Sequence, residues 1–125
     1  MSLKKISVIV LVIISLTACG PETIWLRPGL DTPAQHISNG EQLFSRGKYD
    51  DALREFNRAR ELDPGCVEAY IGAGLVMGRK GDIEAGLEKF KQAQVIADTP
   101  EEKTAVENAY CRFKSMAITK DPQPE

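Results

Sequence analysis

The feature that most constrains the fold is an internal repeat with a constant offset of 34 residues. Side chains between residues 40 and 62 recur, identical or similar in bulk, 34 positions later. A period of 20–50 residues is typical of proteins built from stacked copies of one small unit. The chain is therefore expected to form an array in which neighbouring copies bury each other's apolar faces. The matching pairs are Gly40 and Gly74, Leu43 and Met77, Gly47 and Gly81, Leu53 and Leu87, Phe56 and Phe90, Ala59 and Ala93, and Leu62 and Ile96.

The repeated residues predict two antiparallel helices in each copy. Gly40 and Gly74 fall inside the first helix, where glycine costs about 1 kcal/mol relative to alanine. That cost is explained if another helix approaches too closely for a side chain. Gly47 and Gly81 follow this helix and suit a left-handed C-terminal cap. The second helix is marked by an apolar stripe with helical spacing. This stripe consists of Ala52, Phe56, Ala59 and Leu62.

Residues 33–100 resemble the tetratricopeptide repeat (TPR) family. The resemblance implies an all-α fold, an α-α superhelix with one repeat at 33–66 and a second at 67–100. His36 stands where a large residue is usual, and Gly86 replaces an alanine that packs helices. Asp98 replaces a helix-ending proline, which follows as Pro100. The residues that carry the resemblance are Gly40, Gly47-Lys48-Tyr49-Asp50-Asp51-Ala52, Phe56, Ala59 and Asp63-Pro64 in the first copy, and Tyr70, Gly74, Gly81, Ile83, Phe90 and Ala93 in the second.

A fifth helix is predicted after the second copy. Thr99 and Glu102 have the spacing of a capping box, and Pro100 suits the first helical position. Thr32 and Gln35 have the same spacing at the start of the first copy. The apolar stripe of the fifth helix is Ala105, Val106, Ala109, Tyr110, Phe113 and Met116. It is expected to cap the array over residues 100–117, with a disordered tail at 118–125. The five predicted helices are 33–46, 49–62, 67–79, 83–96 and 100–117.

The first 18 residues have the pattern of an export signal. Lys4 and Lys5 precede an apolar run over residues 6–16, which is shorter than the roughly 20 apolar residues that span a bilayer. The sequence Leu-Thr-Ala before Cys19 resembles the lipobox of bacterial lipoproteins. The resemblance implies cleavage before Cys19 and acyl chains such as palmitate on that cysteine, which anchor the chain in a membrane. An ordinary secretory signal with a chance cysteine is the alternative.

The resemblance to lipoproteins also predicts a location. Gly20, and not an aspartate, follows the lipobox cysteine, which implies sorting to the outer membrane of the bacterial cell envelope, facing the periplasm. Residues 19–32 are then a linker rich in turn-forming residues. Within it, Trp25 and Leu26 have three interpretations: they cover the first helix, touch the membrane interface, or contact a partner.

Composition and side-chain chemistry exclude several classes of function. The formal charge is −2 at pH 7, and it becomes −4 once residues 1–18, which hold two lysines and no acid, are removed. A basic face for nucleic acid is therefore not expected. His36 is the only histidine, and no glycine-rich phosphate loop follows a strand. We expect no catalytic site, no metal and no cofactor.

The two cysteines that remain after Cys19 are not expected to form a disulfide. Cys66 begins the third helix and Cys111 lies about eleven residues into the fifth. In parallel helices this is an axial offset of roughly 16 Å, well beyond the roughly 7 Å between Cα atoms that a bridge allows. Cys111 is predicted to be a small core residue, and Cys66 to be free or partly exposed.

The family resemblance places a binding groove on the first helix of each pair. The predicted function is a scaffold or assembly factor that binds a protein or peptide partner in the periplasm. Self-association through the ends of the array is the alternative, and partial burial of Ile37, Phe44 and Leu75 is the alternative for the groove. The predicted groove residues are Ile37, Glu41, Phe44, Ser45, Ile71, Leu75, Gly78, Arg79 and Arg112.

Overall fold

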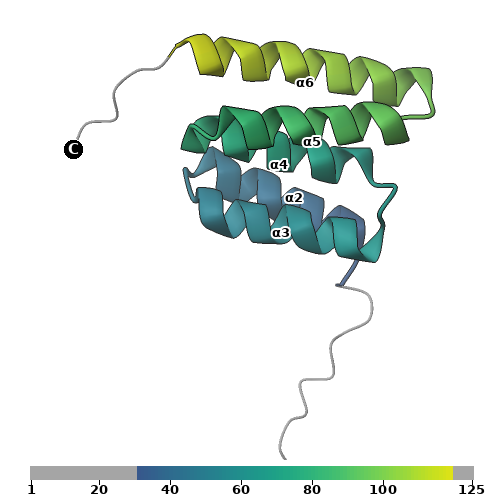
Figure 1. Ribbon diagram of the computed structural model, residues 1–125. Coiled ribbons are helices and arrows are strands. Elements are labelled where there is room, and N and C mark those ends of the chain that lie inside the picture. The colour runs from purple at the N-terminus through teal and green to yellow at the C-terminus, as the bar shows by residue number, and fades with distance from the viewer. Residues whose placement is uncertain (1–30, 120–125) are drawn as a thin grey trace, which may run out of the picture. The chain divides into compact units, whose positions relative to one another are not determined.

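The computed structural model describes residues 31–119, and this part of the chain consists of five α-helices without any strand (Figure 1). The all-α fold class is therefore confirmed. Each helix begins and ends within one residue of its predicted bounds. The predicted export signal, Cys19, Trp25, Leu26 and the tail after Thr119 lie outside the described residues. The helices are α2 (Pro33–Ser45), α3 (Tyr49–Leu62), α4 (Val67–Lys80), α5 (Ile83–Ile96) and α6 (Pro100–Ile118).

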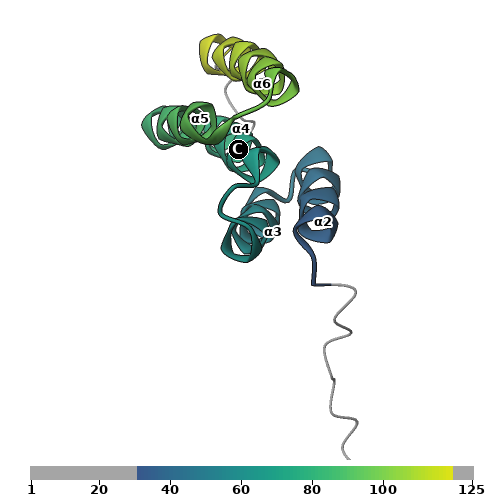
Figure 2. The same cartoon turned by 90° about the vertical axis from the view of Figure 1, so that its right-hand side faces the viewer.

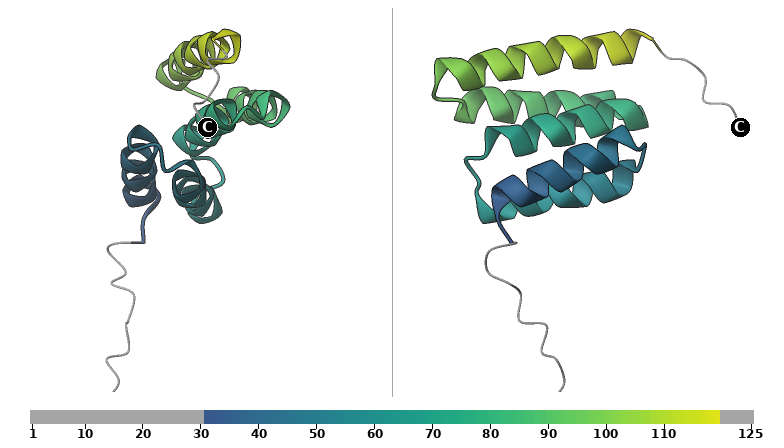
Figure 3. Two further views of the ribbon diagram at one scale, coloured as in Figure 1. Left: turned by 90° about the vertical axis from the view of Figure 1, so that its left-hand side faces the viewer. Right: turned by 180° about the vertical axis from the view of Figure 1, so that it is seen from behind.

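The helices stack as two antiparallel pairs and a single closing helix. α2 packs against α3 and α4 against α5, while α6 lies over α4 and α5. Figures 2 and 3 show that α2, α4 and α6 lie on one side of the array and α3 and α5 on the other. We call the side formed by α2, α4 and α6 the inner face, and the side formed by α3 and α5 the outer face.

The ends of the helices follow the predicted capping signals. The Thr99 hydroxyl accepts from the backbone N–H of Glu102 at 3.2 Å, and Glu102 accepts from the backbone N–H of Thr99 at 3.0 Å, which completes a capping box. At α2 only half of this device forms, because the Gln35 side chain donates to Asn39 instead. Gly47 and Gly81 have φ of +74° and +85°, the left-handed conformation predicted for the ends of the first helices.

The glycines inside the helices make room for phenylalanine rings. The Phe56 ring, 3% exposed, lies between Gly40 of α2 and Gly72 of α4. A Cβ atom on Gly40 would lie 2.8 Å from Cε1 of that ring, and one on Gly72 would lie 2.5 Å from Cζ. Phe90 packs in the same way against Gly74. The close approach predicted for Gly40 and Gly74 is therefore confirmed.

The departure at Gly86 has a structural reason in the closing helix. Phe113 of α6, 1% exposed, covers both Gly78 and Gly86. A Cβ atom on Gly86 would lie 2.5 Å from this ring and 3.1 Å from the backbone oxygen of Gly74. Glycine at this position therefore lets α4 and α5 approach closely and lets α6 dock on both.

The core is divided into two clusters. One forms around Phe56 of α3 and includes Ala73 and Val76 of α4, and the other forms around Phe90 of α5 and Phe113 of α6. Phe44 of α2 packs against both clusters. The array is therefore continuous, because the same ring joins the buried residues of both copies.

Candidate functional site on the inner face

A hollow on the inner face lies between α2 and the start of α4. It has a volume of about 470 Å³. Two of its residues, Ile37 and Glu41, are predicted groove residues. The sequence alone did not predict the other five as groove residues. All seven lining residues are Pro33, Ala34, Ile37, Ser38, Glu41, Cys66 and Glu68.

The hollow combines an apolar wall with acidic side chains. Ile37 is half-buried and packs against the core of the first repeat. Glu41 and Glu68 are exposed, and no described basic side chain forms an ion pair with either. The Cys66 thiol donates to Glu68 at 3.6 Å, and burial raises the pKa of that thiol. Cys66 is therefore a neutral, weakly polar part of the wall.

A contact between α2 and α6 crosses the middle of the inner face. The Arg112 guanidinium of α6 lies over the Phe44 ring of α2, 5.7 Å from its centroid. The Phe44 ring also packs against Tyr49, with centroids 5.7 Å apart. Cation–π contacts of this kind are worth about 0.5–1 kcal/mol at exposed sites. Arg112 therefore bridges α6 and α2 across α4, and its head group is accessible from the inner face.

The remaining predicted groove residues are not equally available. Leu75 is 9% exposed and belongs to the core, and Gly78 is buried beneath Phe113. These two residues offer no surface to a partner, because α6 and the second repeat cover them. Ile71 is half-buried. Ser45 and Arg79 are exposed, and the Ser45 hydroxyl donates to the backbone oxygen of Gln42.

Charge is divided along the inner face. Glu41 and Glu68 belong to the hollow, and Glu68 lies in the first turn of α4. Arg79 lies in the last turn of α4, and Arg112 contacts Phe44 close to the end of α2. The face therefore presents an acidic region at one end and a basic region at the other.

A second polar cluster lies where the chain enters α2. His36 is half-buried at the α2–α3 interface, and its Nδ1 and Nε2 atoms lie 2.8 Å from Glu55 and from Asp31. Arg58 donates to both carboxylate oxygens of Asp31. Both ring nitrogens face carboxylates, so the imidazole has no free nitrogen for a substrate. The cluster therefore joins Asp31 to α2 and α3.

The charges of this cluster shift two pKa values in opposite directions. Burial alone would lower the pKa of His36, but the hydrogen bonds to Asp31 and Glu55 outweigh burial and raise it. Hydrogen bonds from Arg58 and His36 lower the pKa of Asp31 to about 2. The protonated imidazole is therefore the favoured partner of the two carboxylates.

This arrangement predicts a pH dependence of stability. Because the folded pKa of His36 is raised, the stabilisation is fully present below the unfolded value of about 6.5 and is lost as pH rises through the folded value. Urea unfolding at about pH 6 and about pH 8 is expected to show a lower free energy of unfolding at the higher pH. His36→Gln should flatten this difference, since the chain has no other histidine. An unchanged difference in the variant would assign the pH dependence to another group.

The cysteines agree with prediction in one respect and differ in another. Cys66 and Cys111 are both free, and Cys66 is half-buried, as predicted. The prediction that Cys111 belongs to the core is wrong, because its side chain is exposed. Cys111 precedes the buried Phe113 by two residues, which turns it by roughly 200° from the docked side of α6.

Two kinds of feature are not found between residues 31 and 119: metal-binding clusters and membrane-spanning helices. No group of three or more His, Cys, Asp or Glu side chains in this range is arranged to hold a metal ion. None of the described helices is long and apolar enough to cross a membrane.

Comparison with known proteins supports the repeat. The family model of the TPR repeat matches residues 40–81. The chain is 35% identical over 57 residues to tetratricopeptide repeat protein 14 of Mus musculus, and 32% identical over 74 residues to tetratricopeptide repeat protein 13 of Homo sapiens. These segments cover 46% and 57% of this chain but only 7% and 9% of the relatives. No solved structure matches significantly.

Proposed function

We propose that this chain, whose residues 40–81 match the family model of the TPR repeat, is a lipid-anchored scaffold that holds a protein partner on its inner face. TPR repeats generally bind protein partners. The observation that carries the proposal is the hollow between α2 and α4, where Ile37 lies beside Glu41 and Glu68. An apolar wall flanked by unpaired carboxylates suits a peptide segment that carries an apolar and a basic side chain. The proposed role involves no catalysis.

The division of charge indicates how such a segment would lie. Its basic side chain would face Glu41 and Glu68, and an acidic side chain would face Arg79 and Arg112. Opposite charges in these two regions fix direction and suppress binding in reverse, because like charges would then meet.

The location in the cell is a separate part of the proposal. The basic start, the short apolar run and Cys19 after Leu-Thr-Ala are the pattern of an exported lipoprotein. Acylation of Cys19 would hold the array at a membrane, since two or three chains anchor far more stably than one. Gly20 favours the outer membrane, facing the periplasm.

A photocrosslinking amino acid in place of Glu41 tests the binding face. Glu41 is exposed and lines the hollow, so this position is expected to give one discrete adduct with a partner in the membrane fraction. Arg54 is the control position, because its side chain is exposed on α3, on the other side of the array. Cys19→Ser should move the protein out of the membrane fraction and lower the yield of the adduct.

Three outcomes would each contradict a part of this proposal. Adducts of equal yield from positions 41 and 54 would show that the inner face has no special role. An adduct with the mass of two copies from position 41 would favour self-association, and sedimentation of the purified chain at several concentrations would then establish the oligomeric state. Retention of the Cys19→Ser variant in the membrane fraction would exclude the lipid anchor alone.

A further inference from the structure

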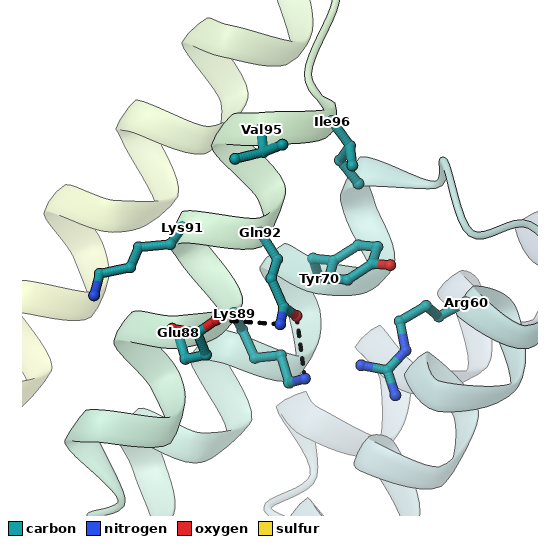
Figure 4. Close-up of a pocket in the computed structure, with 8 residues that line it drawn as sticks. All are labelled: Arg60, Tyr70, Glu88, Lys89, Lys91, Gln92, Val95 and Ile96. Carbon is teal, nitrogen blue, oxygen red and sulfur yellow. Dashed lines mark hydrogen bonds between the residues drawn. The ribbon is translucent and has the colours of Figure 1, made fainter.

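A second hollow lies on the opposite side of the array from the proposed binding face. It has a volume of about 460 Å³ and is formed by the end of α3, the first turns of α4 and the second half of α5 (Figure 4). Its walls include a tyrosine, two aliphatic side chains, a glutamine, three cations and one carboxylate, that of Glu88. None of these residues lines the hollow on the inner face, so this hollow is a separate feature of the surface.

Two cations from different helices face this hollow without a carboxylate partner. Figure 4 shows the Arg60 guanidinium of α3 and the Lys89 ammonium of α5 pointing toward each other. Neither forms an ion pair with any acid between residues 31 and 119. Lys89 donates only to the neutral amide of Gln92, at 3.3 Å, and Gln92 in turn donates to Glu88.

The positive charges of Arg60 and Lys89 repel each other. Lys89 is half-buried, and burial, followed by the positive charge of Arg60, lowers the pKa of its ammonium group, although the charge of Glu88 opposes this shift. An anion held between the two side chains would relieve this repulsion and would receive two charge-assisted hydrogen bonds. The geometry therefore has the charge and the donors of an anion subsite.

An apolar surface lies directly beside these cations. The Tyr70 ring, with Arg60 over it at 5.5 Å from the centroid, forms one wall. Its hydroxyl donates to the backbone oxygen of Pro64, which fixes the ring. Val95, 84% exposed, forms the rim together with half-buried Ile96. A large aliphatic side chain exposed to this degree next to a cationic hollow suits a ligand that has both an anionic and an apolar part.

We propose that this hollow binds an acidic peptide segment of a partner protein, with one carboxylate between Arg60 and Lys89 and an adjacent apolar side chain against Tyr70 and Val95. A free inorganic anion would use only the cations and leave the apolar wall exposed. A peptide uses both, and so it fits the whole surface. The array would then offer two hollows of opposite charge preference, and this second site does not depend on the proposed function of the first.

The test uses the full chain in detergent micelles and a fluorescein-labelled peptide in which glutamates alternate with leucines. Fluorescence anisotropy is expected to show saturable binding that weakens with added salt. Replacing the glutamates by glutamines, or changing Arg60→Gln or Lys89→Gln in the protein, should weaken binding at least about tenfold. Lys91→Gln is the matched control, because Figure 4 shows Lys91 pointing away from Arg60 and Lys89, and it should change binding less than about twofold.

Several results would overturn the proposal. Equal affinity for the glutamate and glutamine peptides would exclude a role for the carboxylate. Full displacement of the peptide by inorganic phosphate at a similar concentration, with no loss on Val95→Ser, would show a generic anion site that does not read a peptide. Circular dichroism of each variant is the control for folding. If helicity and melting temperature are unchanged, weaker binding is due to the altered hollow and not to unfolding.

Discussion

Phe113→Ala is expected to lower the free energy of unfolding by about 3–5 kcal/mol, the usual range for removal of a buried phenylalanine ring. The ring is 1% exposed and covers Gly78 of α4 and Gly86 of α5. It also packs against Phe90, with centroids 5.2 Å apart. Without the ring, both glycine surfaces lose the side chain that lies closest to them, and α6 loses this attachment to α4 and α5. Urea unfolding followed by circular dichroism measures this loss.

Ile118→Ala is the matched control for this variant. It also truncates an apolar side chain of the same helix to a methyl group, but Ile118 is 81% exposed. Its effect is expected to lie within about 0.5 kcal/mol. Hydrogen exchange of α6 amides should also accelerate in Phe113→Ala and remain unchanged in Ile118→Ala. A loss below about 1 kcal/mol for Phe113→Ala would mean that α6 does not close the array through this ring.

The helices and their order could be predicted from the sequence because their signals are local and duplicated. Gly47 and Gly81 end the first helices in the left-handed conformation, and Thr99 with Glu102 starts the last helix with a complete capping box. Each signal depends on residues within one turn. The constant offset of 34 residues then fixes the pairing, since each copy must present the same apolar faces.

The predictions that failed depend on packing between distant segments. Cys111 was expected in the core, but α6 docks on α4 and α5 with one side only, and its other side has no helix beyond it among the described residues. Gly78 has the position of a groove residue, yet Phe113, 35 positions later, covers it. A periodic pattern identifies an apolar stripe, but it does not say how far the stripe extends around the helix.

The candidate site could be predicted only in part for the same reason. Ile37 and Glu41 follow from their position on α2, whereas Cys66 and Glu68 enter the hollow through the placement of α4 beside α2. The 34-residue offset does contain a usable signal, because Glu68 is the counterpart of Ala34, and both line the hollow. The contact of Arg112 with Phe44 crosses three helices and has no local signature.

Gly72→Ala is expected to destabilise the array, although alanine normally stabilises a helix by up to about 1 kcal/mol relative to glycine. The added Cβ would lie 2.5 Å from the Cδ1 and Cζ atoms of Phe56. This ring cannot move away, because Gly40 of α2 confines its other side. Overpacking of this kind costs about 1–3 kcal/mol.

The central claim is that phenylalanine rings seated on bare glycines hold neighbouring helices together, and a double-mutant cycle between Gly72 and Phe56 tests it most directly. Gly72→Ala is measured by urea unfolding in the original chain and in a Phe56→Leu background, where the smaller side chain leaves room for the methyl group. The account predicts destabilisation in the first case, little or no loss in the second, and a coupling free energy of at least about 1 kcal/mol. An equal effect of Gly72→Ala in both backgrounds, or stabilisation in the original chain, would contradict it.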